Sequence, residues 1–316
     1  MTMSVALHDY TNYRRARGEK FTTGAKVLES FVRHVGPNTD VAKIDKDMTH
    51  SYVYRQGANN VTLGLFDRHS ILKGFFRWLI AREEIQNLPL ELELPNRPAR
   101  RLAHIYTDAE LNAIFTACMK YQKDKNVIAP KCIQFILKLT YVLGLRINET
   151  LSIKLKEIDG RNATIRIVGT KFYKSRLVTY NNAVAKLIES ILSWRKQMRM
   201  PNGPKAQLFL DCKNRRIRRA AVDEAFVRIR KAAGLDQIME TGRRPRIHDL
   251  RHTFAVNRLV TWYRSGKEVQ KLLPALSTYL GHSDISHTSV YLRMTPALLS
   301  EANKKFAHYF KKGDCL

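Results

Sequence analysis

Two stretches near the start of the chain place apolar residues at the spacing of an amphipathic helix. The first runs from Val27 to Val35, and the second from Leu72 to Ile80. Residues three and four positions apart lie on one face of a helix, so each stretch presents a broad apolar stripe. Such a stripe belongs to a core more often than to a ligand site. We therefore expect residues 21–93 to form a small helical domain.

A proline-containing segment ends this first pattern. Pro95 and Pro98 interrupt any helix in the basic stretch that follows the helical domain. The next residues, Thr107 to Glu110, match a capping box and precede an apolar helical run. The predicted organisation is therefore a basic linker at 94–106, a second domain at 107–300 and a C-terminal tail at 301–316.

The second domain changes from helical to alternating spacing. Ile133 to Tyr141 is an apolar helical run, and Gly144 permits a tight bend before the next helix. Residues 163–168 and 176–180 alternate apolar and polar side chains, as strands with one buried face do. A basic segment separates the two, so we expect a two-stranded hairpin with a basic tip. The fold class that follows is mostly α-helical with a small β-hairpin or sheet, in two domains.

The charge of the chain indicates its partner. Its 316 residues include 55 Lys and Arg against 28 Asp and Glu, a formal net charge of +27. Such an excess points to a polyanion, most often nucleic acid. The basic residues also cluster, which argues against a protein that is merely basic. The residues that we expect to contact nucleic acid are Arg97, Arg100, Arg101, Lys174, Arg215, Arg216, Arg218, Arg219, Arg243 and Arg244.

The first 20 residues are basic and polar around Tyr13 to Arg17. Two interpretations stay open for this stretch. It is either an arm that lies on nucleic acid or a frayed terminus, since chain ends are ordered only where something ties them down. In both cases we assign residues 1–20 as a basic N-terminal arm outside the helical domain.

Cysteine usage and hydropathy bound the compartment. The four cysteines show no CxxC pair and no zinc-ligand spacing, so reduced thiols are the simplest interpretation. No apolar run is long enough to cross a membrane, and the N-terminus lacks the apolar core of a signal peptide. These features predict an intracellular, cytoplasmic protein.

Residues with the chemistry of phosphate transfer gather towards the C-terminus. His248 and Arg251 open a predicted helix, and His282 and Tyr291 follow it. A guanidinium offers a planar fork of donors that matches a phosphate, and helix N-termini favour phosphate oxygens. A tyrosine hydroxyl can become a covalent nucleophile once its phosphate target is held and neutralised. These side chains suit a protein that breaks and rejoins a phosphodiester backbone.

A metal site is the competing interpretation of His248 and His252, which stand four residues apart. Zinc-binding metalloproteases place a glutamate directly after the first histidine of such a pair. Asp249 occupies that place here, and no third ligand is apparent. We therefore predict no metal.

The order of these residues resembles the tyrosine recombinases, the phage-integrase family. Their C-terminal signature reads His-x-x-Arg, then Leu-Gly-His, then a tyrosine nine residues after that histidine, as in the step from His282 to Tyr291. The stretch from Gly144 to Glu149 resembles the first catalytic box of the same family. The resemblance spans about residues 21–300 and depends on the ordered set of boxes.

The resemblance implies a role for each matching residue. Tyr291 would attack the scissile phosphate and form a 3′-phosphotyrosyl bond, while Lys171 on the hairpin, favoured over Lys174, would protonate the departing 5′ oxygen. The other matching residues would hold the phosphate. Tyr279 and Tyr309 are rival nucleophiles, but neither stands in the family's position. The implied catalytic residues are Arg146, Lys171, His248, Arg251, His282 and Tyr291, with Glu149 supporting Arg146 from behind.

The resemblance also implies an architecture and partners. A helical core-binding domain and an α+β catalytic domain would form a clamp on double-stranded DNA, and four copies would act on two duplexes. Site-specific recombination would serve integration or excision in a bacterial cell, on nucleoid DNA. The ester keeps the bond energy, so neither ATP nor another cofactor would be needed. Residues 291–296 look more like integrases of transposon-type mobile elements than like chromosome-dimer resolvases.

Some features depart from the family, and other functions stay open. The hairpin tip carries the bulky Phe172 and Tyr173, and Arg293 stands where a histidine is expected. A type IB topoisomerase-like enzyme would share the chemistry without strand exchange, and a catalytically idle DNA-binding protein would keep only the fold. The tail, helical by its spacing from Pro296 to Phe310, would dock on a neighbouring protomer or pack on its own domain.

Overall fold

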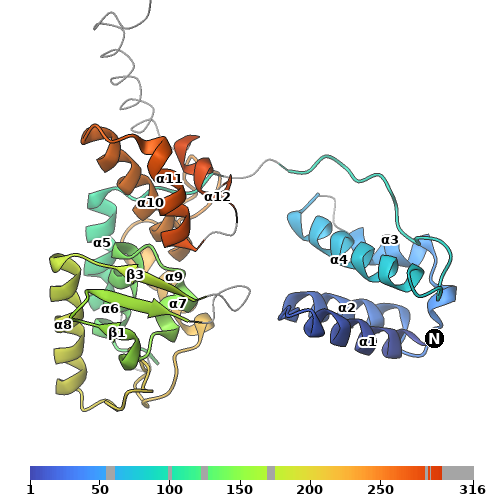
Figure 1. Cartoon of the computed structure of the whole chain (residues 1–316), viewed down its shortest axis with the longest axis horizontal. Helices are drawn as coiled ribbons and strands as arrows, with labels where there is room; N and C mark the ends of the chain where they lie inside the picture. Colours follow the sequence, from blue (N-terminus) through green and yellow to red (C-terminus); the bar gives the residue numbers. More distant parts are fainter. Residues whose placement is uncertain are drawn as a thin grey trace, which may run out of the picture. The chain divides into compact units, whose positions relative to one another are not determined.

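The chain forms two compact units, Met1–Arg100 and Arg101–Leu316, each with its own hydrophobic core (Figure 1). The computed structural model describes residues 1–54, 61–98, 102–121, 127–168, 175–281, 284 and 286–293. The described elements are mostly helical, with a small sheet in the second unit. This confirms the fold class predicted from the sequence.

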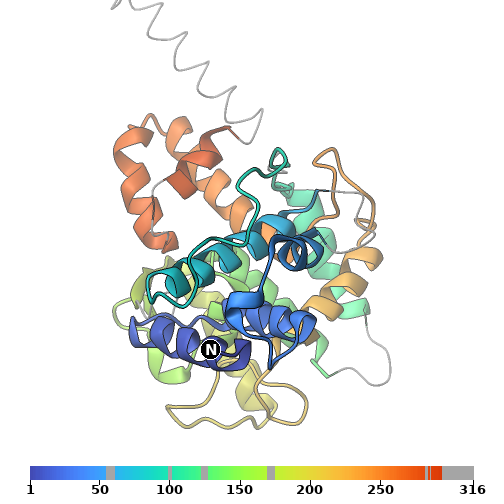
Figure 2. The same cartoon turned by 90° about the vertical axis from the view of Figure 1, so that its right-hand side faces the viewer.

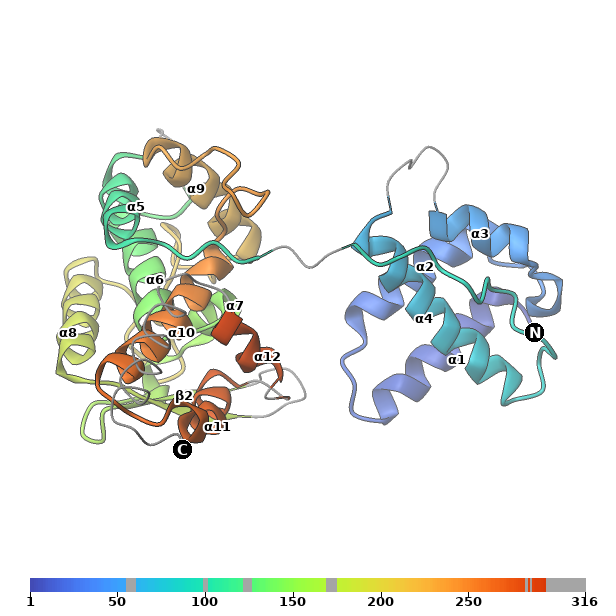
Figure 3. The same cartoon turned by 90° about the horizontal axis from the view of Figure 1, so that it is seen from above.

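Helices build the first unit, and their apolar stripes form its core. The described helices are α1 (Met3–Ala16), α2 (Thr22–Val35), η1 (Val41–Lys43), α3 (Lys46–Tyr54) and α4 (Leu63–Ile80). Helix α2 lies beside both α1 and α4 (Figure 3). Phe31 of α2 packs edge to face on Phe76 of α4, and both rings are fully buried. The helical stripes predicted for this unit are thereby confirmed.

The predicted basic arm at residues 1–20 is wrong, because most of this segment is helix α1 of the first unit. Met3, Ala6 and Tyr10 are almost fully buried in the core. The Tyr10 ring contacts the Phe75 ring, with 5.4 Å between their centroids. The three residues stand three and four positions apart, which is the spacing of one helix face. The arm prediction followed the basic residues that end the helix, whereas burial follows this short stripe.

The second unit combines helices with an antiparallel sheet in the order β1-β2-β3. Its described elements are α5 (Asp108–Lys120), α6 (Pro130–Val142), α7 (Ile147–Ser152), η2 (Leu155–Glu157), β1 (Ile158–Asp159), β2 (Thr164–Ile167), β3 (Arg176–Thr179), α8 (Asn182–Gln197), α9 (Arg219–Ala232), α10 (Ile247–Arg264), α11 (Val269–Leu280), α12 (Ser286–Ser289) and η4 (Val290–Arg293). Strands β2 and β3 pair with Ile165 opposite Val178, which confirms the predicted hairpin strands. Strand β1 has two residues and is too short to show alternation in the sequence.

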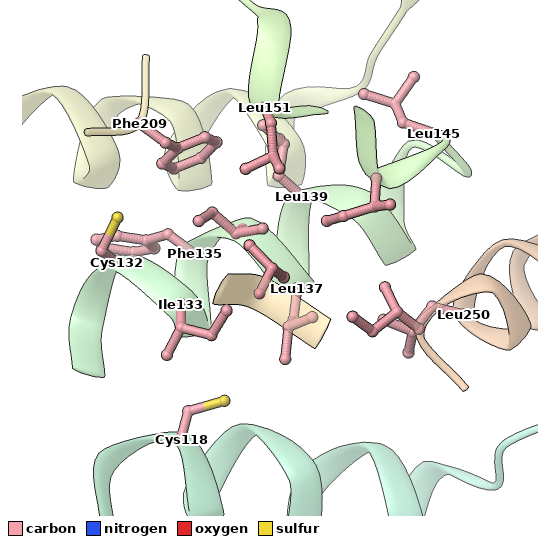
Figure 4. Packing of buried hydrophobic residues seen from close by; sticks show 14 of the residues in the cluster. Cys118, Cys132, Ile133, Phe135, Leu137, Leu139, Leu145, Leu151, Phe209 and Leu250 are labelled. Atoms are coloured by element: carbon pink, nitrogen blue, oxygen red, sulfur yellow. The ribbon is translucent and has the colours of Figure 1, made fainter. Parts of the chain in front are cut away.

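Helix α6 has buried residues on all sides and is surrounded by other helices. It contacts α5, α8 and α10. Figure 4 shows Ile133 and Leu137 of α6 between Cys118 of α5 below and Leu151 of α7 above, with Leu250 of α10 beside them. A helix with buried side chains on all sides belongs in a core. This packing brings the loop after α6 close to the first turns of α10.

The second unit begins before the capping box. The Tyr106 side chain is buried, and its backbone N–H donates to the Thr253 hydroxyl at 3.0 Å. The predicted linker at 94–106 is therefore too long at its C-terminal end. The capping box is confirmed, since the Glu110 N–H donates to the Thr107 hydroxyl at 3.2 Å and the Thr107 N–H donates to the Glu110 carboxylate at 2.8 Å.

Helices α10 and α11 form a further small core with the 3₁₀ helix η4. Phe254 and Leu259 of α10 pack with Leu273 and Leu276 of α11, and Tyr291 of η4 joins them. The two helices lie side by side in Figures 1 and 2, coloured orange to red. The position of Tyr291 against α10 is therefore set by apolar packing.

Cys118 and Cys132 are buried and carry free thiols, Cys212 lies at the surface, and Cys315 lies outside the described residues. Within the part of the chain that the structure describes, none of the helices combines the length and apolar character that a membrane crossing needs.

Candidate functional site

The loop after α6 positions Arg146. Gly144 has a φ of +58°, and a Cβ atom there would overlap the Phe254 ring, so the bend and the close packing both require glycine. The chain then enters α7 with Arg146 as its N-cap. The Arg146 backbone N–H donates to Oε2 of Glu149 at 2.9 Å, and Nη1 donates to Oε1 at 3.0 Å. Nη2 of Arg146 donates to the Gly281 carbonyl oxygen at 3.2 Å, which joins α7 to the end of α11.

Glu149 is a buried carboxylate among three guanidinium groups. Arg176 donates to it as a fork, with Nη1 2.9 Å from Oε1 and Nη2 2.8 Å from Oε2. Nη1 of Arg251 lies 3.8 Å from Oε2. Burial alone would raise the pKa of Glu149, but the hydrogen bonds and charge of Arg176 and the N–H of Arg146 outweigh it and lower the pKa to about 2. The carboxylate therefore stays ionised and holds the arginines together.

Arg251 is fully buried on α10, with 1% of its surface exposed. Its Nη1 donates to the Gly144 carbonyl oxygen at 2.9 Å, and its Nη2 donates to the Leu280 carbonyl oxygen at 2.6 Å. Burial first, and then the charge of Arg146, lower the pKa of Arg251 to about 10. The guanidinium stays cationic at neutral pH and ties the loop after α6 to the end of α11.

Tyr291 lies on η4 with its side chain buried against α10. Its hydroxyl is 3.1 Å from Nδ1 of His252, the residue that follows Arg251. The His252 ring in turn meets the His248 ring, with centroids 4.7 Å apart and nearly perpendicular planes. A phenol, two imidazoles and a buried guanidinium therefore come together around the first turns of α10.

Both histidines are neutral at neutral pH. Loss of water around the ring, followed by the charges of Arg251 and Arg246, lowers the pKa of His248 to about 4, although the residue as a whole is exposed at the surface. Burial, with His248 adding to the shift, lowers the pKa of His252 to about 3. A neutral imidazole accepts a hydrogen bond at one nitrogen and donates from the other. His252 can therefore accept the hydrogen bond of the Tyr291 hydroxyl.

A cavity of about 410 Å³ opens between α10, α11 and the end of β3. Its lining includes Phe254, Trp262, Leu276 and Tyr279, and none of the described candidate catalytic residues. We therefore place the candidate chemistry outside this cavity, in the arginine–histidine cluster. That cluster comprises Arg146, Glu149, Arg176, His248, Arg251, His252 and Tyr291.

The predicted nucleic-acid contacts have different environments. Four of them have exposed side chains just before α9 or at its first residue: Arg215, Arg216, Arg218 and Arg219. Arg244 is exposed as well, and Arg97 lies over the Phe66 ring. Arg243 has 15% of its side chain exposed and donates to buried Asp249 at 3.0 Å, so it is engaged within the protein. The contacts of these residues with DNA stay predictions.

Several predicted site residues lie outside the described residues. They are Lys171, Lys174, His282, Arg100 and Arg101, and the same holds for the tail at 301–316. Two residues close to them in the chain are described and join the cluster. Arg176, two residues after Lys174, binds Glu149, and Gly281, directly before His282, binds Arg146. The roles of Lys171 and His282 stay predictions.

The model of the Phage integrase family matches residues 105–297, more than half of the chain. The chain belongs to the phage integrase family. The tyrosine recombinases of this family are enzymes that break and rejoin DNA, which confirms the predicted enzyme class.

Two curated members of the family span nearly the whole chain. The Sinorhizobium fredii protein y4rB, assigned as an integrase/recombinase, is 28% identical over 308 residues, which are 96% of this chain and 96% of y4rB. The tyrosine recombinase XerC of Pediococcus pentosaceus is 24% identical over 319 residues, covering 94% of this chain and 95% of XerC.

Solved structures of integrases share the fold. The Tn1549 transposon integrase, in complex with a circular intermediate DNA, has a TM-score of 0.71 at 16% identity and covers 98% of this chain and 99% of its own. The lambda integrase tetramer bound to a Holliday junction has a TM-score of 0.67 at 17% identity and covers 92% of this chain and 77% of its own. At these identities the likeness establishes the fold.

Two members of the cluster, His252 and Arg176, are not among the site residues predicted from the sequence. The spacing of His248 and His252 suggests only a metal pair, because it contains no information about a tyrosine 39 positions away. The sequence identifies Arg176 only as the first residue of a predicted strand. It shares the inward face of β3 with buried Val178, and an arginine on an apolar strand face was the signal that could have found it.

Proposed function

We propose that this protein is a site-specific DNA recombinase that acts through a covalent 3′-phosphotyrosyl intermediate, with Tyr291 as the nucleophile. The contact between Tyr291 and His252, next to Arg251, carries the proposal. It brings a hydroxyl nucleophile, a neutral acceptor and a phosphate ligand into one cluster. The rival Tyr279 stacks on Phe254, and burial raises its pKa to about 12, which suits a structural role.

Arg146 and Arg251 hold the scissile phosphate. Three guanidinium groups face the single carboxylate of Glu149, and the excess positive charge suits a phosphodiester anion. Arg146 has 34% of its side chain exposed and is open to an incoming phosphate, while Arg251 supports the site from inside. His248 and His282 add hydrogen bonds to the phosphate oxygens. These preorganised donors stabilise the negative charge that grows during the attack.

Tyr291 attacks the phosphorus, and the bond from phosphorus to the 5′ oxygen breaks with its electron pair left on that oxygen. The phenolic proton passes to Nδ1 of His252, and Lys171 supplies a proton to the 5′ oxygen. A bound phosphate anion offsets the positive charges that help to lower the pKa of His252, so the imidazole becomes a better acceptor. Attack by the 5′ hydroxyl of a partner strand reverses the step. The ester keeps the bond energy, and ATP is not required.

Double-stranded DNA and further copies of the chain are the proposed partners. Lambda integrase has been crystallised as a dimer on a core site and as a tetramer on a Holliday junction, and the Tn1549 integrase has been solved with transposon right end DNA. By analogy, four copies of this chain bind two DNA sites and exchange their strands for the integration or excision of a mobile element. The net charge of +27 supports the binding of DNA phosphates.

The test uses a DNA site selected by binding from a random-sequence library. A nick beside the cleavage position lets the short 5′-hydroxyl strand diffuse away, so any covalent intermediate is trapped. A denaturing gel should show a protein–DNA adduct with the native protein and none with Tyr291→Phe, while both proteins bind the site equally. Binding by the native protein without an adduct would overturn the proposal in favour of an idle binder. Relaxation of supercoiled DNA without exchange between two sites would favour a topoisomerase-like enzyme.

A further inference from the structure

Arg176, at the start of β3, uses all parts of its guanidinium within the cluster. Its Nε donates to the Tyr279 carbonyl oxygen at 2.8 Å, and Nη1 and Nη2 donate to the two oxygens of Glu149. Only 11% of the side chain is exposed. A guanidinium and a carboxylate form such a fork in one shared plane, so each side chain fixes the orientation of the other.

These contacts close into a ring that includes Arg146. Glu149 accepts hydrogen bonds from Arg176 on one side and from Arg146 on the other. Nη2 of Arg146 donates to the Gly281 carbonyl oxygen. Gly281 follows Tyr279 by two residues at the end of α11, and the Tyr279 carbonyl completes the ring by accepting from Arg176. A shift of Arg176 would therefore displace Arg146 and the end of α11 together.

The close packing of Gly281 against Arg176 also indicates that the position of the guanidinium is constrained. A Cβ atom on Gly281 would lie 2.8 Å from Nη1 and 3.0 Å from Cζ of Arg176. The missing side chain leaves room for the guanidinium, and glycine also suits the φ of +69° at this position. The residue after Gly281 is His282, the predicted phosphate ligand.

We propose, on the basis of the recombinase function given above, that Arg176 is a positioning residue for DNA cleavage. It aligns Arg146 through Glu149, and it aligns the end of α11 through the Tyr279 carbonyl. A contribution to stability alone does not account for this arrangement, because a buried ion pair is often no more stabilising than apolar packing of the same volume. Alignment does account for it, because a displacement of about 1 Å in a catalytic site can slow the reaction about 100-fold.

Arg176→Gln and Arg176→Lys test this role, with Arg166→Gln on the exposed face of neighbouring β2 as the matched control. Single-turnover cleavage of the nicked site is measured beside DNA affinity and thermal unfolding. We expect Arg176→Gln to cleave about 100-fold more slowly, as a small displacement predicts, with DNA affinity close to native. Arg176→Lys keeps the charge without the fork and should recover part of the rate. Arg166→Gln should cleave at the native rate.

The pH dependence of cleavage separates alignment from general stability. Glu149 faces Arg146 on α7, Arg176 on β3 and Arg251 on α10, which together keep its carboxylate ionised. Loss of Arg176 removes its strongest hydrogen-bonding partner and raises the pKa of Glu149 towards its ordinary range. Cleavage by Arg176→Gln should then begin to fall at a higher pH on the acid side than cleavage by the native protein.

Native cleavage by Arg176→Gln, or an acid limb identical to that of the native protein, would overturn the positioning role. A loss of cleavage matched by an equal loss of DNA affinity or by unfolding at the assay temperature would also overturn it, because that pattern marks a residue that only supports the fold. Absence of an adduct with the native protein would instead overturn the proposed recombinase function, and the positioning role with it.

Discussion

Helices α7 and α10 are each preceded by an N-cap arginine, and a buried acid follows that arginine three residues later. The pair is Arg146 and Glu149 in α7, and Arg246 and Asp249 in α10. In each pair the acid accepts the backbone N–H of the arginine, at 2.9 Å and 2.8 Å. The acid thus satisfies one of the free N–H groups at the helix start in both cases. One local pattern builds two similar helix starts.

The two acids differ in the other arginines that they bind. Asp249 takes its side-chain contacts from Arg243 and Arg246, within six residues along the chain. Glu149 receives the fork of Arg176 from β3 and lies near Arg251 of α10. Asp249 therefore orients one helix start, whereas Glu149 connects three elements of the unit. An acid that connects distant elements sets the relative positions of their side chains.

The largest expected effect separates the two acids. Glu149→Ala leaves three guanidinium groups together without their anion, and removal of one partner from a buried ion pair costs about 3–5 kcal/mol. Asp249→Ala leaves Arg243, which is 15% exposed, and Arg246, which is 51% exposed, so two guanidinium groups lose their anion instead of three and we expect a smaller loss of about 3 kcal/mol, at the lower end of that range. Chemical denaturation of the variants measures both free energies of unfolding. Equal losses would remove the distinction between the two helix starts.

The next effect concerns the chemistry on α10. His252→Asn retains an acceptor near the place of Nδ1 but cannot take up a proton from Tyr291. We expect cleavage of the nicked site to slow by about 100-fold, the lower range for loss of a general base, with native DNA affinity. Single-turnover gels and binding titrations measure the two quantities. A native cleavage rate would show that the phenolic proton leaves by another route.

As the pH falls, the two histidines of α10 should lower the free energy of unfolding before Glu149 of α7 does. The pKa values of His248 and His252 are lowered to about 4 and about 3, whereas an unfolded histidine titrates at about 6.5. Between these values the unfolded chain binds protons that the folded chain excludes, so the free energy of unfolding falls as the pH drops from about 6.5 towards 4. Glu149, with its pKa lowered to about 2, adds a loss only below its ordinary value of 4.5.

Thermal unfolding at pH 7 and at pH 5 measures this effect. We expect a loss of about 1–2 kcal/mol at the lower pH, after discounting His248 for its contact with solvent. His252→Asn should lose less than the native protein, because it no longer carries one of the two titrating groups. The same pH dependence in both proteins would contradict this account.

The smallest expected effect lies outside both helix starts. Arg216→Ala removes one exposed cation and should weaken DNA binding a few-fold on every sequence, lowering the slope of log affinity against log salt by about 1. Cleavage at saturating protein should stay native, because Arg216 is not part of the arginine–histidine cluster. Binding titrations at several salt concentrations measure the slope. An unchanged slope would remove Arg216 from the predicted DNA contacts.

Much of the fold follows from local patterns. These patterns are the capping box at Thr107, the bend at Gly144 and the alternating strands. Each involves residues only a few positions apart, so a short segment of sequence is enough to predict it. The arm and the end of the linker were predicted wrongly because Tyr10 and Tyr106 are ordered by residues far along the chain. Tyr10 packs on Phe75 of α4, and Tyr106 bonds to α10.

The candidate site divides in the same way. The residue types that suit phosphate binding and nucleophilic attack, and their order from Arg146 to Tyr291, are properties of the sequence alone, and the family match confirms the enzyme class that they indicated. Only the tertiary structure decided which side chains meet. The fork of Arg176 on Glu149 and the contact of Tyr291 with His252 join residues 27 and 39 positions apart. Helix and strand periodicity constrains neighbours within a few residues, whereas the packing of α7, α10 and α11 with β3 and η4 sets these longer contacts.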